Sequence, residues 1–328
     1  MSGTNTGEGL QIAQKFCQKW VLPFLETEFP DLHDRSACVL FGGSQSLGND
    51  DVLSRDHGWG PAFELFLTNA DARQYGRQLQ RALNEAAPRN WQGAEWRELH
   101  PNVSVRAIDT WMRQHMRYPH PPKTRLAWLR MCESQLYMMR HCTVFHDPLG
   151  EFSRRKEAYH YYPRDVWLQR VWDETFSVWH YGEYNFIDRM VHRGDRVTIS
   201  VCLGAFSESA MRLCLLLNED YTPYWKWLAT EFRKLPDIEE LDRNLDGLMT
   251  NCDLSVQAGH VKTICRDIFM RLTAKGLVHG DLDADEHCLK IAKRDLRRLM
   301  DDKGLPVESW SISAVMPGAR RVPDNLFE

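Results

Sequence analysis

The residues with the greatest capacity for chemistry are a Gly-Gly-Ser turn at 42–44 and the Asp56-His57 pair that follows it. Glycines permit backbone conformations that other residues resist, so the chain can approach a ligand closely. Backbone N–H groups at a turn leading into a helix attract anions, and Ser44 adds a hydroxyl donor. Mg2+ prefers oxygen ligands, so nearby carboxylates could hold it against bound phosphates. The stretch predicts a phosphate site, although an ordinary turn between two strands has the same glycines.

Apolar runs on both sides of this turn predict the strands that would position it. Residues 37–41 and 62–67 give a strand, a tight turn with a helix start, and a second strand. Residues 103–108 alternate in polarity, and residues 142–145 form another short apolar run, so both are expected to be strands. Helical spacing is expected at 10–29, 70–87, 110–116 and 126–139. Alternation of strands and helices is typical of layered α and β structure.

The pattern changes after residue 163 and becomes helical. Helices are expected over 165–192 and 196–218, with two or three more between 241 and 299. A chain of 328 residues is long enough for about two domains. We therefore expect an α+β chain with a small mixed-sheet domain at 1–155 and an all-helical domain at 156–328.

Two motifs resemble a known superfamily. Gly-Gly-Ser followed by a distant Asp resembles the signature of the polymerase-beta-type nucleotidyltransferases, and the string Ser54-Arg-Asp-His-Gly-Trp-Gly-Pro61 resembles a domain-of-unknown-function family within that superfamily. Downstream, Tyr161-Tyr-Pro163, Arg212-Leu213 and Tyr221-Thr-Pro-Tyr-Trp-Lys-Trp227 are similar to the same family. The resemblance covers roughly residues 35 to 235. It implies a nucleotidyltransferase-like first domain followed by a helical one.

The resemblance implies Mg2+-dependent transfer of a nucleoside monophosphate from a nucleoside triphosphate, with ATP as the expected donor, to a small-molecule acceptor. The triphosphate would lie on Gly43 and Ser44. Asp56 would act as catalytic residue and metal ligand, and Glu64 would be a further metal ligand. His57 is expected to act as a base or second ligand, or else to hydrogen-bond its own loop. The helical domain would supply three nucleotide-binding side chains: Arg212, Tyr224 and Lys226.

This chain departs from the superfamily pattern at its acidic positions. Gly58 stands where a second carboxylate is expected, and two-metal chemistry needs ligands for both ions. The third carboxylate has four candidates: Glu64, Glu98, Asp109 and Asp147. The alternative function is therefore a catalytically degenerate protein that binds a nucleotide or a partner on the same scaffold. A transferase acting on protein or RNA would need an extended basic groove, and the sequence has only short basic clusters such as 154–156.

Several residues have a structural alternative to a role in the site. Asp147 could face the site or cap the next helix. Arg212 lies in an apolar run and needs a partner, which could be Asp188, Asp195 or a ligand phosphate. Tyr224 and Lys226 follow Pro223, a residue that favours helix starts, and could simply belong to a surface helix anchored by its tryptophans.

A second short motif, at residues 278–289, resembles the His-Gly-Asp catalytic loop of aminoglycoside-type phosphotransferases. Glu286 stands where that pattern has an asparagine. We expect instead a loop whose acids cap the following helix.

Composition excludes some classes of function. A net charge of −4 argues against a general nucleic-acid binder, which normally has a basic face. The sequence contains no run of 18 apolar residues, so no membrane span is expected, and its polar first nine residues do not resemble a signal peptide. The nine cysteines include no C-x-x-C pair and fit reduced thiols, so a cytoplasmic location is expected.

Overall fold

The computed structural model describes residues 7–56, 59–88, 90–91, 94–95 and 103–305, with only the backbone given for Arg55, Asp56, Asn90, Ala94 and Glu95. The chain divides into two compact units, Met1–Tyr161 and Tyr162–Glu328, and each is described by itself. The boundary expected after residue 155 falls inside helix α9, Glu151–Ala158. The first unit contains a sheet covered by helices, whereas the described part of the second unit is helical, so the α+β class is confirmed.

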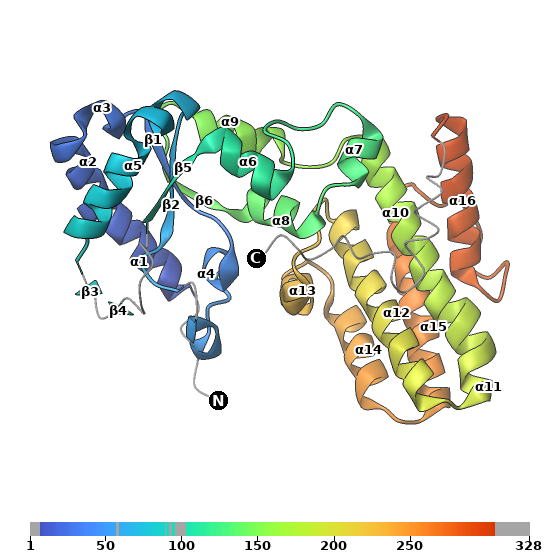
Figure 1. Ribbon diagram of the computed structural model, residues 1–328. Coiled ribbons are helices and arrows are strands. Elements are labelled where there is room, and N and C mark those ends of the chain that lie inside the picture. Colours follow the sequence, from blue (N-terminus) through green and yellow to red (C-terminus); the bar gives the residue numbers. More distant parts are fainter. Residues whose placement is uncertain (1–6, 57–58, 89, 92–93, 96–102, 306–328) are drawn as a thin grey trace. The chain divides into compact units, whose positions relative to one another are not determined.

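The first unit is organised around a four-stranded mixed sheet with strand order β5-β2-β1-β6 (Figure 1). Its strands are β1 Ser36–Leu40, β2 Phe63–Leu67, β5 Val103–Ala107 and β6 Thr143–His146. Strand β1 runs antiparallel to both β2 and β6, while β2 and β5 are parallel. All four strands match the expected runs to within one or two residues. A separate two-stranded sheet pairs β3, Asn90–Trp91, with β4, Ala94–Glu95.

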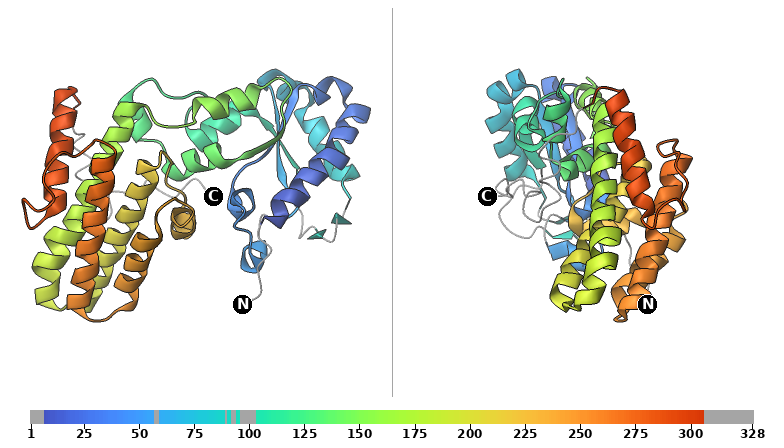
Figure 2. Two further views of the ribbon diagram at one scale, coloured as in Figure 1. Left: turned by 180° about the vertical axis from the view of Figure 1, so that it is seen from behind. Right: turned by 90° about the vertical axis from the view of Figure 1, so that its right-hand side faces the viewer.

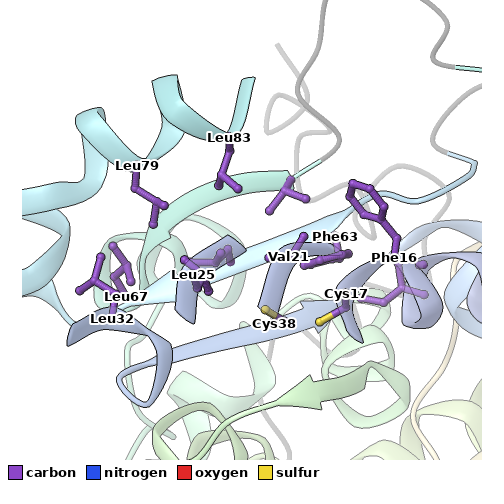
Figure 3. Packing of buried hydrophobic residues seen from close by; sticks show 14 residues of the cluster. Phe16, Cys17, Val21, Leu25, Leu32, Cys38, Phe63, Leu67, Leu79 and Leu83 are labelled. Atoms are coloured by element: carbon purple, nitrogen blue, oxygen red, sulfur yellow. The ribbon is translucent and has the colours of Figure 1, made fainter. Parts of the chain in front are cut away.

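One face of the four-stranded sheet carries the apolar core that Figure 3 shows. Side chains of Phe16, Cys17 and Val21 lie against Cys38 and Phe63 with no more than 5% of any side chain exposed. Four helical segments cover this face: α1 Glu8–Phe16, η1 Cys17–Val21, α2 Leu22–Glu28 and α5 Asn69–Ala86. The expected helix at 10–29 is thus continuous but contains one π-helical turn, and α3, Pro30–His33, follows it.

Helix α5 also contributes to this face of the sheet. Leu79 and Leu83 are buried and point toward the sheet (Figure 3). Thr68 caps the helix by accepting a hydrogen bond from the Asp71 backbone N–H. Asp71 itself is buried and forms an ion pair with Arg35 at 2.6 Å, so it fastens α5 to the start of β1.

The opposite face is covered by a second group of helices. They are α6 Ile108–Met116, α7 Arg125–Leu129, α8 Glu133–His141 and α9. The ring of Phe66 on β2 lies 5.0 Å from that of Trp111 and 4.9 Å from that of Phe152, so α6 and α9 share this core. The single helix expected over 126–139 is wrong, because α7 ends before α8 begins.

The second unit is a bundle in which α10, α12 and α15 run side by side (Figures 1 and 2). Its helices are α10 Arg164–Trp179, η3 His180–Met190, α11 Val191–Arg193, α12 Arg196–Leu217, α13 Trp225–Phe232, α14 Glu239–Thr250, α15 Leu254–Ala274 and α16 Cys288–Asp302. Asp195 and Asp253 cap α12 and α15 by accepting hydrogen bonds from first-turn backbone N–H groups. Capping aspartates of this kind satisfy donors that the helix cannot satisfy itself.

Helix α12 has the length and apolar composition of a membrane-spanning helix, with a mean hydropathy of 1.5 over its most apolar window. However, 61% of that window is buried inside the structure. The core helix of a bundle has the same composition, and α12 packs on α10, η3 and α15. All nine cysteines lie within the described residues and are free.

Candidate functional site

The Gly-Gly-Ser turn follows β1 directly and leads into a short helix, α4, Gly43–Leu47. Gly42 has φ 86° and Gly43 has φ 73°, conformations that side chains with a Cβ rarely adopt. A Cβ built on either glycine would meet no atom within 4 Å, so this backbone is open to close approach. The turn with a helix start is therefore present as the sequence predicts.

The turn is held from behind by the side chain of Gln45. Its Nε2 donates to the Gly60 carbonyl oxygen at 2.9 Å, and its Oε1 accepts from the Gly60 N–H at 2.8 Å. Gln45 is buried, so both hydrogen bonds are shielded from water. The pair fixes the beginning of α4 against the end of the Ser54–Pro61 motif. Gln45 was missed from the sequence because a glutamine in a turn gives no sign of its partner.

A second anchor is Asp50, which is fully buried. Its carboxylate accepts hydrogen bonds from the backbone N–H groups of Gly7 and Gly9 and from Trp59 Nε1, at 2.5, 2.8 and 2.9 Å. It therefore joins the loop after α4 to the first turn of α1, where the helix dipole favours an acid. Neighbouring acids at 50 and 51 look like a solvated loop in the sequence, which is why Asp50 was not singled out.

Asp56 ends a short 3-10 helix, η2 Val52–Asp56, rather than lying on the second strand, as the superfamily signature implies. Only its backbone is described, and His57 lies outside the described residues. The catalytic roles of Asp56 and His57, and the role of Asp56 as a metal ligand, therefore stay predictions. Glu98, one of the four candidates for the third carboxylate, also lies outside the described residues.

Glu64 lies on β2, on the face that α6 covers, and its partner is a cation. Arg106 Nε on β5 donates to Glu64 Oε2 at 3.1 Å. The side chain of Arg106 is 52% exposed and that of Glu64 is 24% exposed. Burial raises the pKa of the Glu64 carboxyl, and the charge and hydrogen bond of Arg106 act in the opposite direction. Glu64 is also the register partner of Val39 on β1, so it lies near the strand end that carries the turn.

His115 on α6 belongs to the same face. Its ring stacks on Trp111 at 4.3 Å, and Trp111 in turn contacts Phe41, the residue before the turn, at 4.6 Å. Burial lowers the pKa of His115, and the charge of Arg106 lowers it further. Arg106 and His115 were not identified from the sequence, because only the parallel pairing of β5 with β2 brings Arg106 to Glu64.

The remaining described acid candidates are occupied by structural contacts. Asp109 forms an ion pair with Arg155 at 2.5 Å. Asp147 accepts from the backbone N–H groups of Glu151 and Ser153 at 3.1 and 2.7 Å, so it caps α9, the second of its two expected roles. Within the described residues no group of three His, Cys, Asp or Glu side chains could hold a metal ion. These residues alone therefore do not fit a two-metal centre, and Asp56 as the residue that holds Mg2+ stays a prediction.

In the second unit, Arg212 has a partner that the sequence analysis did not name. Its Nε and Nη2 contact Glu208 Oε1 at 2.9 and 2.7 Å, one helical turn away on α12. Of the two acids expected to hold it, Asp195 caps α12 and Asp188 contacts His287 at 3.2 Å. Neither of the two acids suggested as partners holds Arg212, and the other alternative, a ligand phosphate, stays a prediction.

Tyr224 and Lys226 lie at the start of α13. Tyr224 is the N-cap residue, so Pro223 precedes the helix instead of occupying its first turn. Tyr224 and Trp225 are 51% and 70% exposed, and Lys226 Nζ lies 4.9 Å from the ring centroid of Trp227. The exposed tyrosine is available for stacking, and its predicted role in nucleotide binding is untested.

The His-Gly-Asp stretch forms a loop before α16. Backbone N–H groups of His279 and Gly280 donate to Asp295 Oδ2 on that helix, at 3.2 and 3.0 Å. Asp285 accepts from the N–H of His287, the residue before α16, at 3.1 Å. The stretch is a loop, as the sequence analysis expected, but its acids do not cap α16, because no side chain accepts a capping hydrogen bond at the start of that helix.

Comparison with known proteins adds a limited assignment. Residues 128–228 match a protein-family model described as "Domain of unknown function (DUF4037)". That segment contains the downstream motif from Tyr161 to Trp227 but neither the Gly-Gly-Ser turn nor Asp56. No curated protein matches the chain.

Among solved structures, the chain matches a nucleotidyltransferase-like protein from Exiguobacterium sibiricum 255-15 with a TM-score of 0.34 and 9% identity. The match covers 89% of this chain and 91% of that one. A TM-score this low carries no argument about function. The family match is confined to about a third of the 328 residues, and its description assigns no activity.

Proposed function

We propose that this protein binds a nucleoside triphosphate on the Gly43-Ser44 turn and transfers the nucleoside monophosphate to a small-molecule acceptor. The observation that carries the proposal is the open turn at the end of β1, with Gly42 and Gly43 both at positive φ and no atom within 4 Å of a Cβ at either position. Backbone N–H groups in such a turn bind phosphate oxygens without a dedicated cation.

The proposed reaction places an acceptor nucleophile in line with the α-phosphate. The acceptor oxygen or nitrogen forms the new bond to phosphorus, the bond to the bridging oxygen breaks, and pyrophosphate leaves. Positioning and neutralisation of charge would supply most of the rate enhancement. We propose Asp56 as the residue that holds Mg2+, with ATP as the donor and Arg212, Tyr224 and Lys226 as further nucleotide contacts. A cytoplasmic location stays a prediction.

A second candidate function is nucleotide binding without transfer. The Glu64–Arg106 ion pair favours it, because a carboxylate already paired with a guanidinium is a poor ligand for a second cation. Gly58, where the resemblance expects an acid, has the same implication. In this case the turn would still bind the nucleotide, and the protein would sense the nucleotide concentration or present the bound nucleotide to a partner.

Calorimetric titration with ATP, GTP, CTP and UTP, each with and without Mg2+, tests both candidates. The transferase predicts binding of one nucleotide that needs Mg2+, is lost in Asp56→Ala, and survives in the control Asp31→Ala, an exposed aspartate on α3. Nucleotide binding without transfer predicts affinity indifferent to Mg2+ and to Asp56, with no pyrophosphate released when candidate acceptors are added. In both cases Gly43→Val should abolish binding, because it strains the turn and blocks the approach. Failure of all four nucleotides to bind would overturn both functions.

A further inference from the structure

A groove of about 770 Å3 lies in the first unit between helix α5 and strand β5. Strand β5 is an edge strand of the four-stranded sheet, and α5 packs along it. Small residues line the groove: Ala72 and Gly76 on α5, and Ala107 on β5. A Cβ built on Gly76 would meet only the Ala72 Cβ within 4 Å, at 3.9 Å, so a longer side chain at this position would project into the groove.

The side chain of Gln80 shows what the outer edge of β5 accepts. Its Oε1 accepts from the Val105 N–H at 2.7 Å, and its Nε2 donates to the Val103 carbonyl oxygen at 3.0 Å. A neighbouring strand would make the same pair of hydrogen bonds. Asn84 Oδ1 accepts from the same Nε2 at 2.9 Å and so holds the amide in place.

The next position along this edge is open. Because the N–H and C=O of one strand residue point to the same side, and alternate residues share that side, the Val105 carbonyl oxygen and the Ala107 N–H also point away from β2. Both residues line the groove, and no side chain or backbone group among the described residues hydrogen-bonds to this donor or this acceptor. An edge strand with an unpaired donor and acceptor is a template for pairing with another chain.

The groove is also basic. Arg77 and Arg81 lie one turn apart on α5, are exposed and line the groove. Like charges at this spacing repel each other, and within the described residues neither guanidinium group has an ion pair. Arg106 lines the groove as well, although its Nε is paired with Glu64. Glu85 is the one acid among the described lining residues, so the charge of the groove favours an anionic partner.

We propose that this groove binds an extended acidic peptide segment of a partner protein, which adds to the edge of β5 as a further strand. A peptide N–H would donate to the Val105 carbonyl oxygen, and a peptide C=O would accept from the Ala107 N–H. Main-chain hydrogen bonds supply the affinity in this mode of binding, and side chains supply the specificity.

The spacing of the charges fits such a strand. Residues four apart on a helix, as Arg77 and Arg81 are, rise by about 6 Å along its axis. Every second side chain of an extended peptide lies on the same face, at a spacing of about 7 Å. Carboxylates at alternate positions can therefore reach successive arginines. A nucleic acid could also neutralise these arginines, but its backbone has no repeating donor and acceptor to pair with the strand edge.

The test is fluorescence anisotropy with the full chain and a fluorescein-labelled octapeptide that alternates threonine and glutamate. We expect saturable binding that weakens as salt is added. The same probe with glutamine in place of glutamate should bind about tenfold more weakly or worse. Two further probes carry N-methyl groups at either the odd or the even backbone positions and keep the full charge. One of the two should lose about tenfold more affinity than the other, because only one set of N–H groups faces β5.

Variants of the groove separate its shape from its charge. Gly76→Gln fills the groove and improves the helix propensity of α5, so it should fold and should weaken the probe about tenfold or more. Arg77→Gln with Arg81→Gln should have a similar effect through the lost charge. The matched control, Lys15→Gln with Lys19→Gln, removes two exposed cations at the same spacing from α1 and η1 and should leave the affinity within about twofold. Circular dichroism establishes that each variant is folded.

No saturable binding, or equal affinity of the two N-methylated probes, would overturn strand addition. Unchanged affinity in Gly76→Gln would place the contact outside the groove. Tighter binding of an oligouridylate RNA of the same length than of the glutamate peptide, with the same dependence on Arg77 and Arg81, would replace the peptide with a nucleic acid as partner. The inference does not rest on the proposed nucleotide site, because the probes carry no nucleotide and the groove contains no residue of the turn at 42–44.

Discussion

The side-chain amide of Gln45 pairs with both backbone hydrogen-bonding groups of Gly60, at 2.8 and 2.9 Å. An amide satisfies a peptide group in this way because it offers one donor and one acceptor at matching spacing. The contact joins the short helix after the Gly-Gly turn to the end of the Ser54–Pro61 motif. The shape of the candidate phosphate-binding turn therefore depends on a residue fifteen positions before its partner.

Replacing this amide by a carboxylate should loosen the turn. In Gln45→Glu the donor to the Gly60 carbonyl is lost and a buried charge faces that oxygen, which should cost about 1–3 kcal/mol of unfolding free energy. Urea denaturation measures the change. Gln78→Glu, at an exposed position on α5, is the matched control and should stay within about 0.5 kcal/mol of the parent. Equal effects of the two substitutions would show that the Gln45 contact contributes nothing specific.

Two helical glycines should respond in opposite directions to the same substitution. At Gly9 on α1 a Cβ would lie 2.7 Å from Trp59 Nε1 and 2.8 Å from Gln45 Cδ, so Gly9→Ala must displace Gln45 and Trp59, the donor to Asp50. It should destabilise the protein by about 1–3 kcal/mol, as overpacking does. At Gly204 on α12 a Cβ meets nothing within 4 Å, so Gly204→Ala should stabilise by about 0.4–1 kcal/mol.

Thermal unfolding of the two alanine variants, compared with the parent under one buffer condition, distinguishes these outcomes. A stabilising Gly9→Ala would contradict the tight packing of α1 against the loop.

Glu183 on η3 should make stability fall as pH rises. It is 3% exposed and accepts hydrogen bonds from Cys288 Sγ and the Leu289 N–H at the start of α16. Burial raises its pKa to about 7, and the hydrogen bond from Cys288 and the charge of His287 offset part of that rise. The folded state therefore retains a proton that the unfolded state has lost between about pH 4.5 and 7, and stability declines across that window.

Glu183→Gln removes the titrating group and keeps an oxygen for the Leu289 N–H. Above pH 7 it should be more stable than the parent by about 1–3 kcal/mol, and the difference should vanish below about pH 4.5. Unfolding free energies measured from pH 4 to 8 give the comparison, with Glu85→Gln on the surface of α5 as a pH-independent control. A Gln variant that is less stable at every pH would mean that the charged form is needed to cap α16.

The Glu64–Arg106 pair should be more costly to break at high pH than at low pH. Arg106→Gln removes the cation that lowers the pKa of Glu64, so this carboxyl retains its proton to higher pH. The unfolding free energy should fall by about 1–2 kcal/mol at pH 8, because the buried Glu64 carboxyl then either ionises without its partner or keeps a proton that the unfolded state has released. The fall should be smaller at pH 5. Denaturation at both pH values provides the measurement.

The double variant Glu64→Gln, Arg106→Gln should recover most of that loss, because neither charge then lacks a partner. If it is no more stable than Arg106→Gln alone, the two residues are not energetically coupled.

The sequence by itself determined the elements and the turn. Short apolar runs located β1, β2 and β6, alternation of polarity located β5, and helical spacing located α5, α10 and α12, because each of these patterns is complete within a few residues. The consecutive glycines identified the turn for the same reason: a positive φ is a local demand that glycine meets. Capping by Asp147 was foreseen as one of two roles, since a cap and its helix are neighbours in the chain.

Only the tertiary structure decided which side chains meet. Arg106 reaches Glu64 because β5 lies parallel beside β2, and Asp50 reaches Gly7 and Trp59 because α1 packs next to the loop after α4. Such partners depend on strand order and helix packing, which no local pattern encodes. Even for Arg212, whose partner Glu208 is one turn away, the sequence left several acids open as partners, and only packing chose between them.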